Sequence, residues 1–426
     1  SYGFPKIQWI SNDDYYDHFK RNPAHFTTNA NNNYRSGVGT SKYAREVISA
    51  TYFRGDAAFF NRRLQFVGGI RAEQTNVKAS GPLTDPTRAF QRDANGNVLR
   101  GPTGTALLIV PTNAGLPYSE LTYIDRGQKT QKEYLRLFPN LNVSYSVLEN
   151  LTARFAYYQS VGRPDFNQYA GGLTLPDTSA PVTTNTVISV NNAGIKAWSA
   201  ETYKVRLEYY FERVGALNIG AYQRDFKNFF GSVRFPATPE FLALYDLDRD
   251  EYGIYDVTTN HNLSTTVRMT GLEIDYKQAL TFLPHWARGV QAFANASTNR
   301  ATGDGSANFA GFTPLTVNWG ASLTRPKFAV RLNWNYRAPQ RRGLIGVNLN
   351  NSIEASTYNW GSKRLYTDVN ADYNIRRNLT AFVNMRNVAD QTEDSKIYGP
   401  NTPDYAKFRQ RVDYGSAWSI GLRGSF

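Results

Sequence analysis

Residues 202–211 read TYKVRLEYYF, and this stretch decides the fold class. Apolar and polar side chains alternate along it, with Tyr203 and Val205 on one face and Lys204 and Arg206 on the other. Successive side chains of a β-strand point to opposite faces of the sheet, whereas a helix repeats about every 3.6 residues. The period of two therefore predicts a strand that separates an apolar environment from a polar one.

The same alternation recurs from residue 42 to the end of the chain. It is clearest at 141–147, 315–324 and 328–337, where nearly every second residue is apolar. With the first stretch, the predicted strands number about thirteen: 42–54, 64–73, 141–147, 151–158, 202–211, 217–223, 272–277, 290–297, 315–324, 328–337, 365–375, 379–386 and 418–426.

Short and long connections alternate between these strands. Turns of a few residues follow positions 147, 211, 324 and 375. The long connections are rich in Asn, Gly, Pro, Thr and Asp and have no period of their own, so we predict loops without regular structure, with single helical turns only at 15–19 and 240–245. Short turns at one rim and long loops at the other are typical of an outer-membrane barrel. The long connections are 80–128, 163–197, 231–262, 339–357 and 391–411.

The composition excludes several classes of protein. The 426 residues include no Cys, which excludes a disulfide scaffold and a thiolate metal centre. Aromatic residues make up 14% of the chain, too many for a disordered protein. The longest apolar run, 106–110, is far shorter than the ~20 residues of a membrane-spanning helix. The net charge is +13, but the cations are spread over strand faces and turns, without the basic stripe of a nucleic-acid-binding protein.

Two architectures fit an alternating all-β chain. In a β-sandwich the apolar faces meet in a core, and in a membrane barrel they meet lipid while the polar faces line a wet lumen. We favour the barrel because strands of about ten residues match the bilayer thickness. Aromatic residues such as Trp334 also lie near strand ends, and charges such as Arg206 lie in the middle of a polar face. A soluble sandwich remains the alternative.

Particular stretches also resemble a known family. Residues 137–166 read LFPNLNVSYSVLENLTARFAYYQSVGRPDF, a strand with Pro-Asn, a short turn and a strand that ends in Arg-Pro. Residues 191–212 read NNAGIKAWSAETYKVRLEYYFE, and 222–229 resembles the strand that follows this segment in the family. These stretches are similar to the TonB-dependent receptors of Gram-negative outer membranes. Ala193-Gly194 and Ala197 depart from the usual Asn-Pro and Pro, which bears on the loop conformation.

The end of the chain carries a further resemblance. It alternates and finishes on an aromatic residue, like the terminal strand signal that the barrel-assembly machinery reads in the outer membrane; the alternative is an ordinary amphipathic last strand. The residues of this assembly signal are Trp418, Ile420, Leu422 and Phe426.

The resemblance implies a fold and a division of the chain. The fold is all-β, an antiparallel transmembrane β-barrel of about 22 strands around a plug, with long extracellular loops and short periplasmic turns. We expect this chain to supply the C-terminal strands, about thirteen of them. Residues 1–41 then end an extracellular loop, residues 42–426 form the barrel part, and the plug, the first strands and a signal peptide lie outside the chain.

The resemblance also implies a function. Such a receptor imports a scarce nutrient, a ferric siderophore or an oligosaccharide, across the outer membrane by energy-coupled gating. We expect the TonB protein to engage the missing N-terminal region, with outer-membrane lipid and the barrel-assembly machinery as further partners and with neither a nucleic acid nor a cofactor. We find no catalytic motif and expect no enzyme. A passive porin-like channel and a soluble β-sandwich binding module remain the alternatives.

Candidate ligand contacts come from two sets of residues. Lumen-facing charges can bind a ligand, or they can simply pair across strands and hydrate the lumen; they are Arg154, Arg206, Glu208, Arg331 and Arg337. Loop aromatics can stack on sugars or flat chelates, or they can pack the loop itself; they are Tyr169, Trp198, Tyr245, Tyr252 and Trp360.

Metal-binding patterns are weak. Asp246, Asp248 and Asp250 have the D-x-D-x-D spacing of a calcium loop, but Glu251 stands where Gly is required and Val257 where the terminal Glu is required. A solvated acidic turn is the alternative. The four His residues show no ligand spacing, and we predict no metal site beyond this weak calcium candidate.

Overall fold

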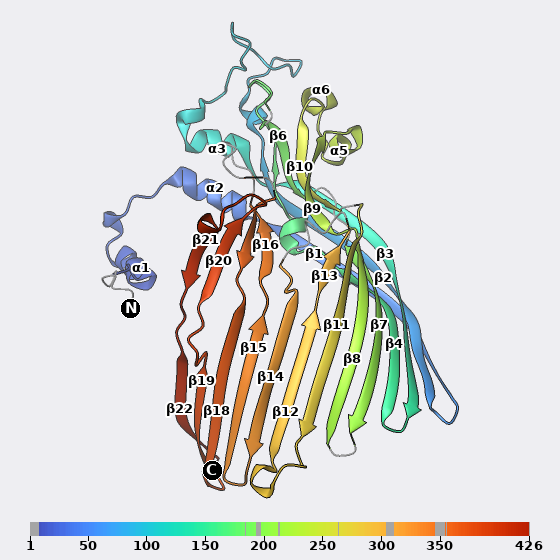
Figure 1. Ribbon diagram of the computed structural model, residues 1–426. Helices are drawn as coiled ribbons and strands as arrows, with labels where there is room; N and C mark the ends of the chain where they lie inside the picture. Colours follow the sequence, from blue (N-terminus) through green and yellow to red (C-terminus); the bar gives the residue numbers. More distant parts are fainter. Residues whose placement is uncertain are drawn as a thin grey trace.

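Long strands laid side by side dominate the computed structural model of the chain (Figure 1). The structure describes residues 8–183, 185–192, 197–211, 214–262, 264–303, 311–345, 354 and 356–425. One continuous antiparallel ladder links thirteen of its strands, each pairing with the next. Each of the thirteen segments predicted from the alternation overlaps one strand of this wall. The wall strands are β1 (Tyr43–Phe59), β2 (Leu64–Thr84), β3 (Tyr123–Leu148), β4 (Leu151–Gly162), β7 (Trp198–Phe211), β8 (Gly215–Lys227), β11 (Val267–Ala279), β12 (Val290–Thr298), β14 (Leu315–Thr324), β15 (Phe328–Arg337), β18 (Arg364–Arg376), β19 (Leu379–Arg386) and β22 (Ala417–Gly424).

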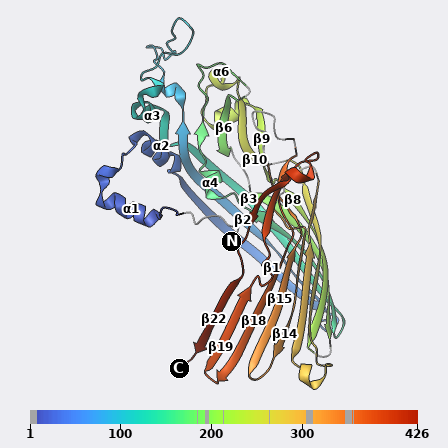
Figure 2. The ribbon, with the colours of Figure 1, turned by 60° about the vertical axis from the view of Figure 1, so that its left-hand side comes forward.

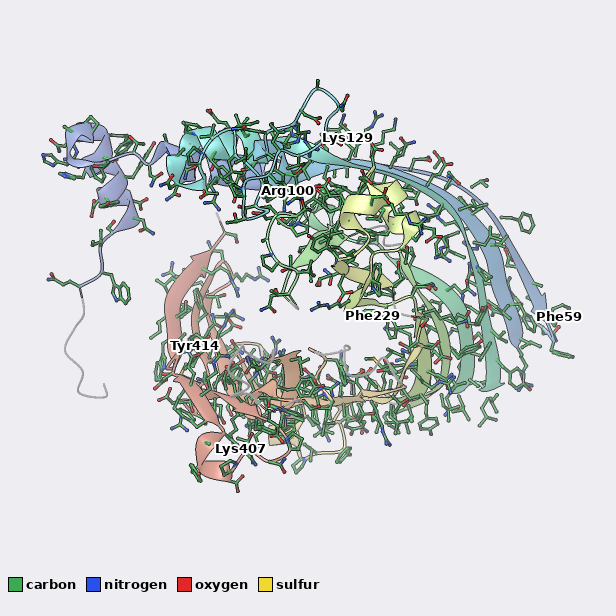
Figure 3. The ribbon with its side chains drawn as sticks, turned by 90° about the horizontal axis from the view of Figure 1, so that it is seen from above. Phe59, Arg100, Lys129, Phe229, Lys407 and Tyr414 are labelled. Atoms are coloured by element: carbon green, nitrogen blue, oxygen red, sulfur yellow. The ribbon has the colours of Figure 1, made fainter. Side chains whose placement is uncertain are left out.

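The wall curves but does not close (Figure 3). Over the described part of the chain, β1 pairs only with β2 and β22 pairs only with β19. The structure therefore contains no closed barrel but an open arc with two free edges. Short turns join its strands at one rim and long loops rise from the other, as the alternating connection lengths predict (Figures 1 and 2).

The apolar face of the wall is exposed on the convex side. Val205 is 52% exposed and Leu207 is 44% exposed, and the next strands present Ile219 and Leu272 in the same way. In a sandwich these side chains would be buried against a second sheet, so the sandwich alternative is wrong for this chain. Trp319 and Trp334 lie opposite each other on this face and stack with ring centroids 6.1 Å apart.

The long loops contain regular structure that the sequence analysis did not predict. Ordered pairing within them includes parallel ladders and a separate small sheet, because these strands find partners far away in sequence. Our prediction of structureless loops is therefore wrong. The loop strands are β5 (Leu173–Thr174), β6 (Val187–Asn192), β9 (Phe230–Pro236), β10 (Asp256–Asn262), β13 (Arg300–Thr302), β16 (Gln340–Leu344), β17 (Tyr358–Gly361), β20 (Glu393–Tyr398) and β21 (Phe408–Val412).

The helices of the described residues lie in the connections between wall strands and in the part of the chain before residue 41. The predicted turn at 15–19 is part of a ten-residue helix, and the eleven-residue α2 was not predicted at all. None of the described helices is both long and apolar enough to cross a bilayer. The α-helices are α1 (Asn12–Arg21), α2 (Ala30–Thr40), α3 (Leu116–Thr122), α4 (Phe166–Tyr169), α5 (Pro239–Leu244) and α6 (Arg249–Tyr252); the 3-10 helices are η1 (Pro23–His25), η2 (Pro86–Ala89), η3 (Thr112–Ala114), η4 (His285–Ala287) and η6 (Asp404–Ala406).

The main hydrophobic core lies in the loops, above the wall. Leu173 and Ile188 from one loop pack with Leu242 and Val257 from another. This core joins two loops that are adjacent along the arc into one layer at the outer rim. Fully buried side chains of the described residues therefore lie in this loop layer, and others lie on wall strands, such as Val77 in β2 and Val267 in β11.

Candidate ligand-binding site

Three of the predicted lumen charges form one cluster on the concave face. Arg154 in β4 lies directly opposite Arg206 in β7, an arrangement of like charges that is unfavourable by itself. Glu208 relieves it: its carboxylate accepts from Arg154 Nε at 3.0 Å and lies 3.4 Å from Arg206 Nε. The Tyr210 hydroxyl donates to the same carboxylate at 2.9 Å. We call these four residues the lower cluster.

The lower cluster lies close to the rim that carries the short turns. Arg154 is three residues past Leu151, where β4 begins, and Glu208 is three residues before Phe211, where β7 ends. Glu208 is only 7% exposed, and its charge is neutralised by ion pairs with Arg154 and Arg206. The position and the pairing agree with the interpretation that these charges stabilise the wall, and their role as ligand contacts remains a prediction.

Further polar side chains continue along the concave face between the two rims. Lys204 bonds Glu273 on the other side of β8, with Nζ 2.5 Å from Oε2. Asn318 donates to Asn295 at 2.8 Å and accepts from Asn335, so three strands are linked by one amide ladder. The concave face is therefore a continuous polar surface, as the alternation predicts for a lumen wall.

A second arginine cluster lies at the loop end of the same face. Arg337 at the end of β15 lies directly opposite Arg364 at the start of β18, again as a pair of like charges. Arg364 and the Tyr366 hydroxyl both bond Glu393, which comes from loop strand β20. A small pocket brings Arg337 and Arg364 together with Arg342, Glu393 and Asp394. We call this set the mouth cluster.

The surroundings of Glu393 in the mouth cluster favour the ionised form of its carboxyl group. Burial alone would raise the pKa of Glu393, but its bonds to Tyr366 and Arg364 and the nearby Arg342 outweigh burial and hold the pKa below its usual value. Arg337 is exposed and, among the residues that the structure describes, forms no ion pair. Arg337 therefore contacts no described carboxylate, whereas in the lower cluster Glu208 contacts both arginines.

The remaining predicted charge, Arg331, lies in β15 on the face of Arg337. It is exposed and is placed opposite Ser322 and Asn370. The structure brings it into neither cluster.

The predicted loop aromatics pack mainly against the protein. Tyr252 is 4% exposed within the loop core, and Tyr245 packs against that core through Phe241, with ring centroids 5.0 Å apart. Burial raises the pKa of both hydroxyls. Tyr169 is 3% exposed and sits beneath its loop against Val77. These positions agree with the interpretation that the aromatics pack the loops.

The two candidate tryptophans also have aromatic neighbours. Trp198 packs against Phe226 and Phe229, with ring centroids 5.4 and 6.1 Å away. Trp360 in β17 stacks nearly parallel on Tyr398, with centroids 4.9 Å apart. The contacts of Trp198 are tilted, and the stack of Trp360 occupies one face of its ring, so ligand stacking on these tryptophans remains a prediction.

The three acidic residues of the calcium candidate lie in a turn and at the start of a short helix. Asp248 caps α6 by accepting from the Asp250 amide at 2.8 Å, and Asp246 occupies a turn with a φ of 54°. Nowhere in the described ranges do three His, Cys, Asp or Glu side chains converge as a metal would need. The alternative of a solvated acidic turn fits these residues.

The assembly-signal residues lie on the last strand. Trp418, Ile420 and Leu422 project from one face of β22 and are each more than 60% exposed. Phe426 lies outside the described residues, as does Ala193-Gly194. The role of this strand in assembly remains a prediction.

Arg342, Arg364 and Glu393 are not among the residues predicted from the sequence. The alternation could have identified Arg364. It directly precedes the strand predicted at 365–375, and continuing the alternation by one residue places it on the polar face of that strand. Arg342 and Glu393 lie in connections without a period, and only the fold brings them to the end of β15. No local signal marks them.

A family model described as "TonB dependent receptor-like, beta-barrel" matches residues 1–388. The chain belongs to the TonB-dependent receptor family. This confirms the resemblance drawn from residues 137–166 and 191–212. Members of this family are receptors of Gram-negative outer membranes that bind ligands and interact with TonB, and the family is not a class of enzymes.

Solved structures agree with this assignment at the level of the fold. The ferric yersiniabactin uptake receptor FyuA from Yersinia pestis matches with a TM-score of 0.53 and 12% identity over 90% of this chain and 46% of its own. The Ferric-Catecholate import receptor Fiu from E. coli K12 matches with a TM-score of 0.55 and 14% identity over 90% of this chain and 45% of its own. A variant of the ferric enterobactin receptor PfeA from Pseudomonas aeruginosa matches with a TM-score of 0.53 and 14% identity over 90% of this chain and 55% of its own.

The chain thus spans about half the length of the receptors that it resembles. Identities this low show the shared fold alone. No curated protein sequence matches the chain.

Proposed function

We propose that the protein takes part in TonB-dependent uptake of an anionic metal chelate, such as a ferric siderophore, across the outer membrane. The observation that carries the proposal is the mouth cluster, where Arg337, Arg342 and Arg364 face two carboxylates. Guanidinium groups bind carboxylate and catecholate oxygens by charge-assisted hydrogen bonds, often two at a time. Their place at the loop end of the polar face is where a ligand arriving from outside first meets the lumen.

The charges favour this ligand over an oligosaccharide. A neutral sugar needs open aromatic faces and neutral hydrogen-bonding groups, but Trp360 at the mouth is stacked on Tyr398. Solved relatives carry names such as ferric enterobactin receptor and ferric citrate transporter, which supports a metal chelate for this chain as well. An oligosaccharide would be recognised mainly by loop residues outside the mouth cluster.

We further propose that other strands and a plug complete the barrel in the membrane. The free edges of β1 and β22 support this, because a bilayer offers no water to satisfy unpaired backbone groups. The exposed apolar residues of the convex face then contact lipid, and TonB supplies the energy for release through the plug. A passive porin-like channel would need neither a plug nor TonB.

The test is uptake of iron chelates by cells that depend on this receptor. Growth of a strain lacking the chain's gene is compared in two sets of cultures. One set receives single anionic ferric chelates as the iron source, and the other receives single oligosaccharides as the carbon source. We expect growth on one anionic chelate to be lost, and to be lost equally when TonB is removed. Growth that survives loss of TonB would support the porin-like channel. A defect confined to an oligosaccharide would contradict the proposed ligand class.

A further inference from the structure

A cluster of cations lies on the convex face, on the opposite side of the wall from the mouth cluster. Arg45 in β1 and Lys78 in β2 are directly opposite each other in the ladder. Lys129 in β3 is opposite Ser80, which makes it a diagonal neighbour of Lys78. Cross-strand pairs lie about 5 Å apart and diagonal neighbours about 7–8 Å apart, so the three charges repel one another.

The chain compensates these charges only in part. Arg45, Lys78 and Lys129 are all exposed, and no carboxylate within the described residues forms an ion pair with them. The carboxylate nearest to them in the ladder on this face is Glu133, which is opposite Asn76 and is thus a diagonal neighbour of Lys78 without forming an ion pair with it. One carboxylate beside three cations leaves an excess of positive charge. A wall that places like charges opposite each other gains stability from a bound anion.

The register puts the cluster just outside the proposed hydrocarbon band. The convex face of β3 is apolar from Tyr145 up to Leu135, which is 62% exposed, and this length matches a bilayer crossing. Lys78 is level with Gln131, four residues beyond Leu135. At about 3.3 Å per residue and a tilt of about 45°, that is roughly 9 Å above the hydrocarbon, at the depth of lipid headgroups.

The surface around the cations is also hollowed. A shallow groove is lined by Tyr43, Lys78, Ser80, Lys129 and Gln131, which offers a ring, a hydroxyl and an amide beside the two ammonium groups. Seen from above, Lys129 lies at the outer margin of the arc, away from the loop core (Figure 3). The groove therefore opens toward the surrounding membrane and not toward the lumen.

We propose that Arg45, Lys78 and Lys129 bind the phosphate groups of an anionic lipid of the outer leaflet. Three cations at headgroup depth complement a phosphorylated headgroup, while the apolar band below them accommodates its acyl chains. The site rests on the proposed membrane placement but not on the transported ligand. It gives the receptor a fixed lipid contact beside β1.

The test is lipid binding by the receptor purified from the outer membrane in detergent. Native mass spectrometry measures binding of bisphosphorylated lipid A, of the same lipid with its phosphates removed, and of inorganic phosphate. Variants are Lys78→Gln, Lys129→Gln and both together; Lys78→Arg is the conservative rescue. The matched control is Lys277→Gln, because Lys277 is an exposed strand lysine on the concave face.

We expect each lost cation to weaken binding of the phosphorylated lipid about fivefold, and the double variant about 25-fold. Lys78→Arg and Lys277→Gln should bind like the parent protein. Without lipid, Lys78→Gln should melt a few degrees higher, since it removes repulsion, while the stabilisation by added lipid A shrinks. A variant that is merely misfolded would melt lower.

Equal binding of the dephosphorylated lipid, or unchanged binding by the double variant, would overturn the proposal. Competition by inorganic phosphate at the same concentration would overturn it in favour of a free-anion site. None of these outcomes depends on uptake, so the lipid site and the proposed transport function can fail separately.

Discussion

The lower cluster and the mouth cluster share one arrangement but differ in how their arginines are paired. Each places two arginines directly opposite each other on neighbouring strands of the concave face. In the lower cluster, Glu208 contacts both Arg154 and Arg206. In the mouth cluster, Glu393 bonds Arg364, and the described residues give Arg337 no carboxylate of its own. The paired arginines of the lower cluster fit a role in stabilising the wall, whereas Arg337, which has no ion-pair partner among the described residues, fits the proposed binding of an anion.

The largest expected effect is loss of the carboxylate from the lower cluster. Glu208→Ala leaves two opposed arginines and the Tyr210 hydroxyl without their shared acceptor. We expect the free energy of unfolding to fall by about 1.5–3 kcal/mol, the range for hydrogen bonds to charged groups. Thermal melting of the detergent-solubilised receptor measures this change, and ligand selectivity should not change.

The matched control is Glu149→Gln in the exposed turn between β3 and β4. Glu149 carries the same charge near the same rim but has no paired arginine among the described residues, so its melting temperature should remain that of the parent. If the two variants melt alike, the lower cluster is not a stabilising unit, and the comparison between the clusters loses its basis.

The contrast between the clusters also shows what sequence can and cannot predict. Alternation identified the wall, because each strand contacts apolar surroundings on one face and polar surroundings on the other regardless of its neighbours. It therefore also identified Arg154, Arg206 and Glu208 as residues of one face. It could not predict β20 or Glu393, because loop strands are stabilised by partners far away in sequence, and a segment without a period gives no local signal of such pairing.

The aromatic predictions had the same limitation. The prediction that Tyr252 and Trp360 contact a ligand assumes that loop aromatics are exposed, and therefore that the loops have no core. The structure gives the loops a core that includes Tyr252, and it stacks Trp360 on Tyr398. Sequence composition does not reveal whether an aromatic ring faces solvent or a neighbouring loop, because this depends on which loops meet at the rim.

A smaller effect is expected at the mouth, and it should appear in binding rather than in stability. Arg337→Gln and Arg342→Gln each remove one cation of the mouth cluster. We expect the affinity for the transported chelate to fall about tenfold for the double variant, with a melting temperature within a few degrees of the parent. Equilibrium binding of the radiolabelled iron chelate to the purified receptor measures this change.

The paired control is Arg154→Gln in the lower cluster. It removes the same charge from the same face but should leave chelate affinity unchanged while lowering stability. A loss of affinity in Arg154→Gln alone would reverse the assignment and move the ligand site to the short-turn rim. Unchanged affinity in the mouth double variant would remove the observation on which the proposed ligand class rests.

The smallest expected effect is a pH dependence at the edge of the mouth cluster. Arg411 in β21 donates two hydrogen bonds to Asp394 in β20, at 2.7 and 2.9 Å, and this holds the pKa of Asp394 below its usual value. A carboxylate with a lowered pKa stabilises the fold above its unfolded pKa of about 3.9 and loses that contribution as the pH falls through its folded value.

The β20–β21 pairing should therefore be unchanged from neutral pH down to about pH 4 and should loosen only below it. Because Arg411 is half exposed, solvent screening limits the effect to less than about 1 kcal/mol. Hydrogen exchange of the β20 amides, compared between the parent and Asp394→Asn at each pH, measures it. The two proteins should converge as the pH falls, since the parent then loses the charge that the variant lacks. A difference that persists at pH 2 would mean that packing, and not the Asp394–Arg411 ion pair, stabilises this strand. The ion pairs at the mouth would then contribute less to stability than their geometry indicates.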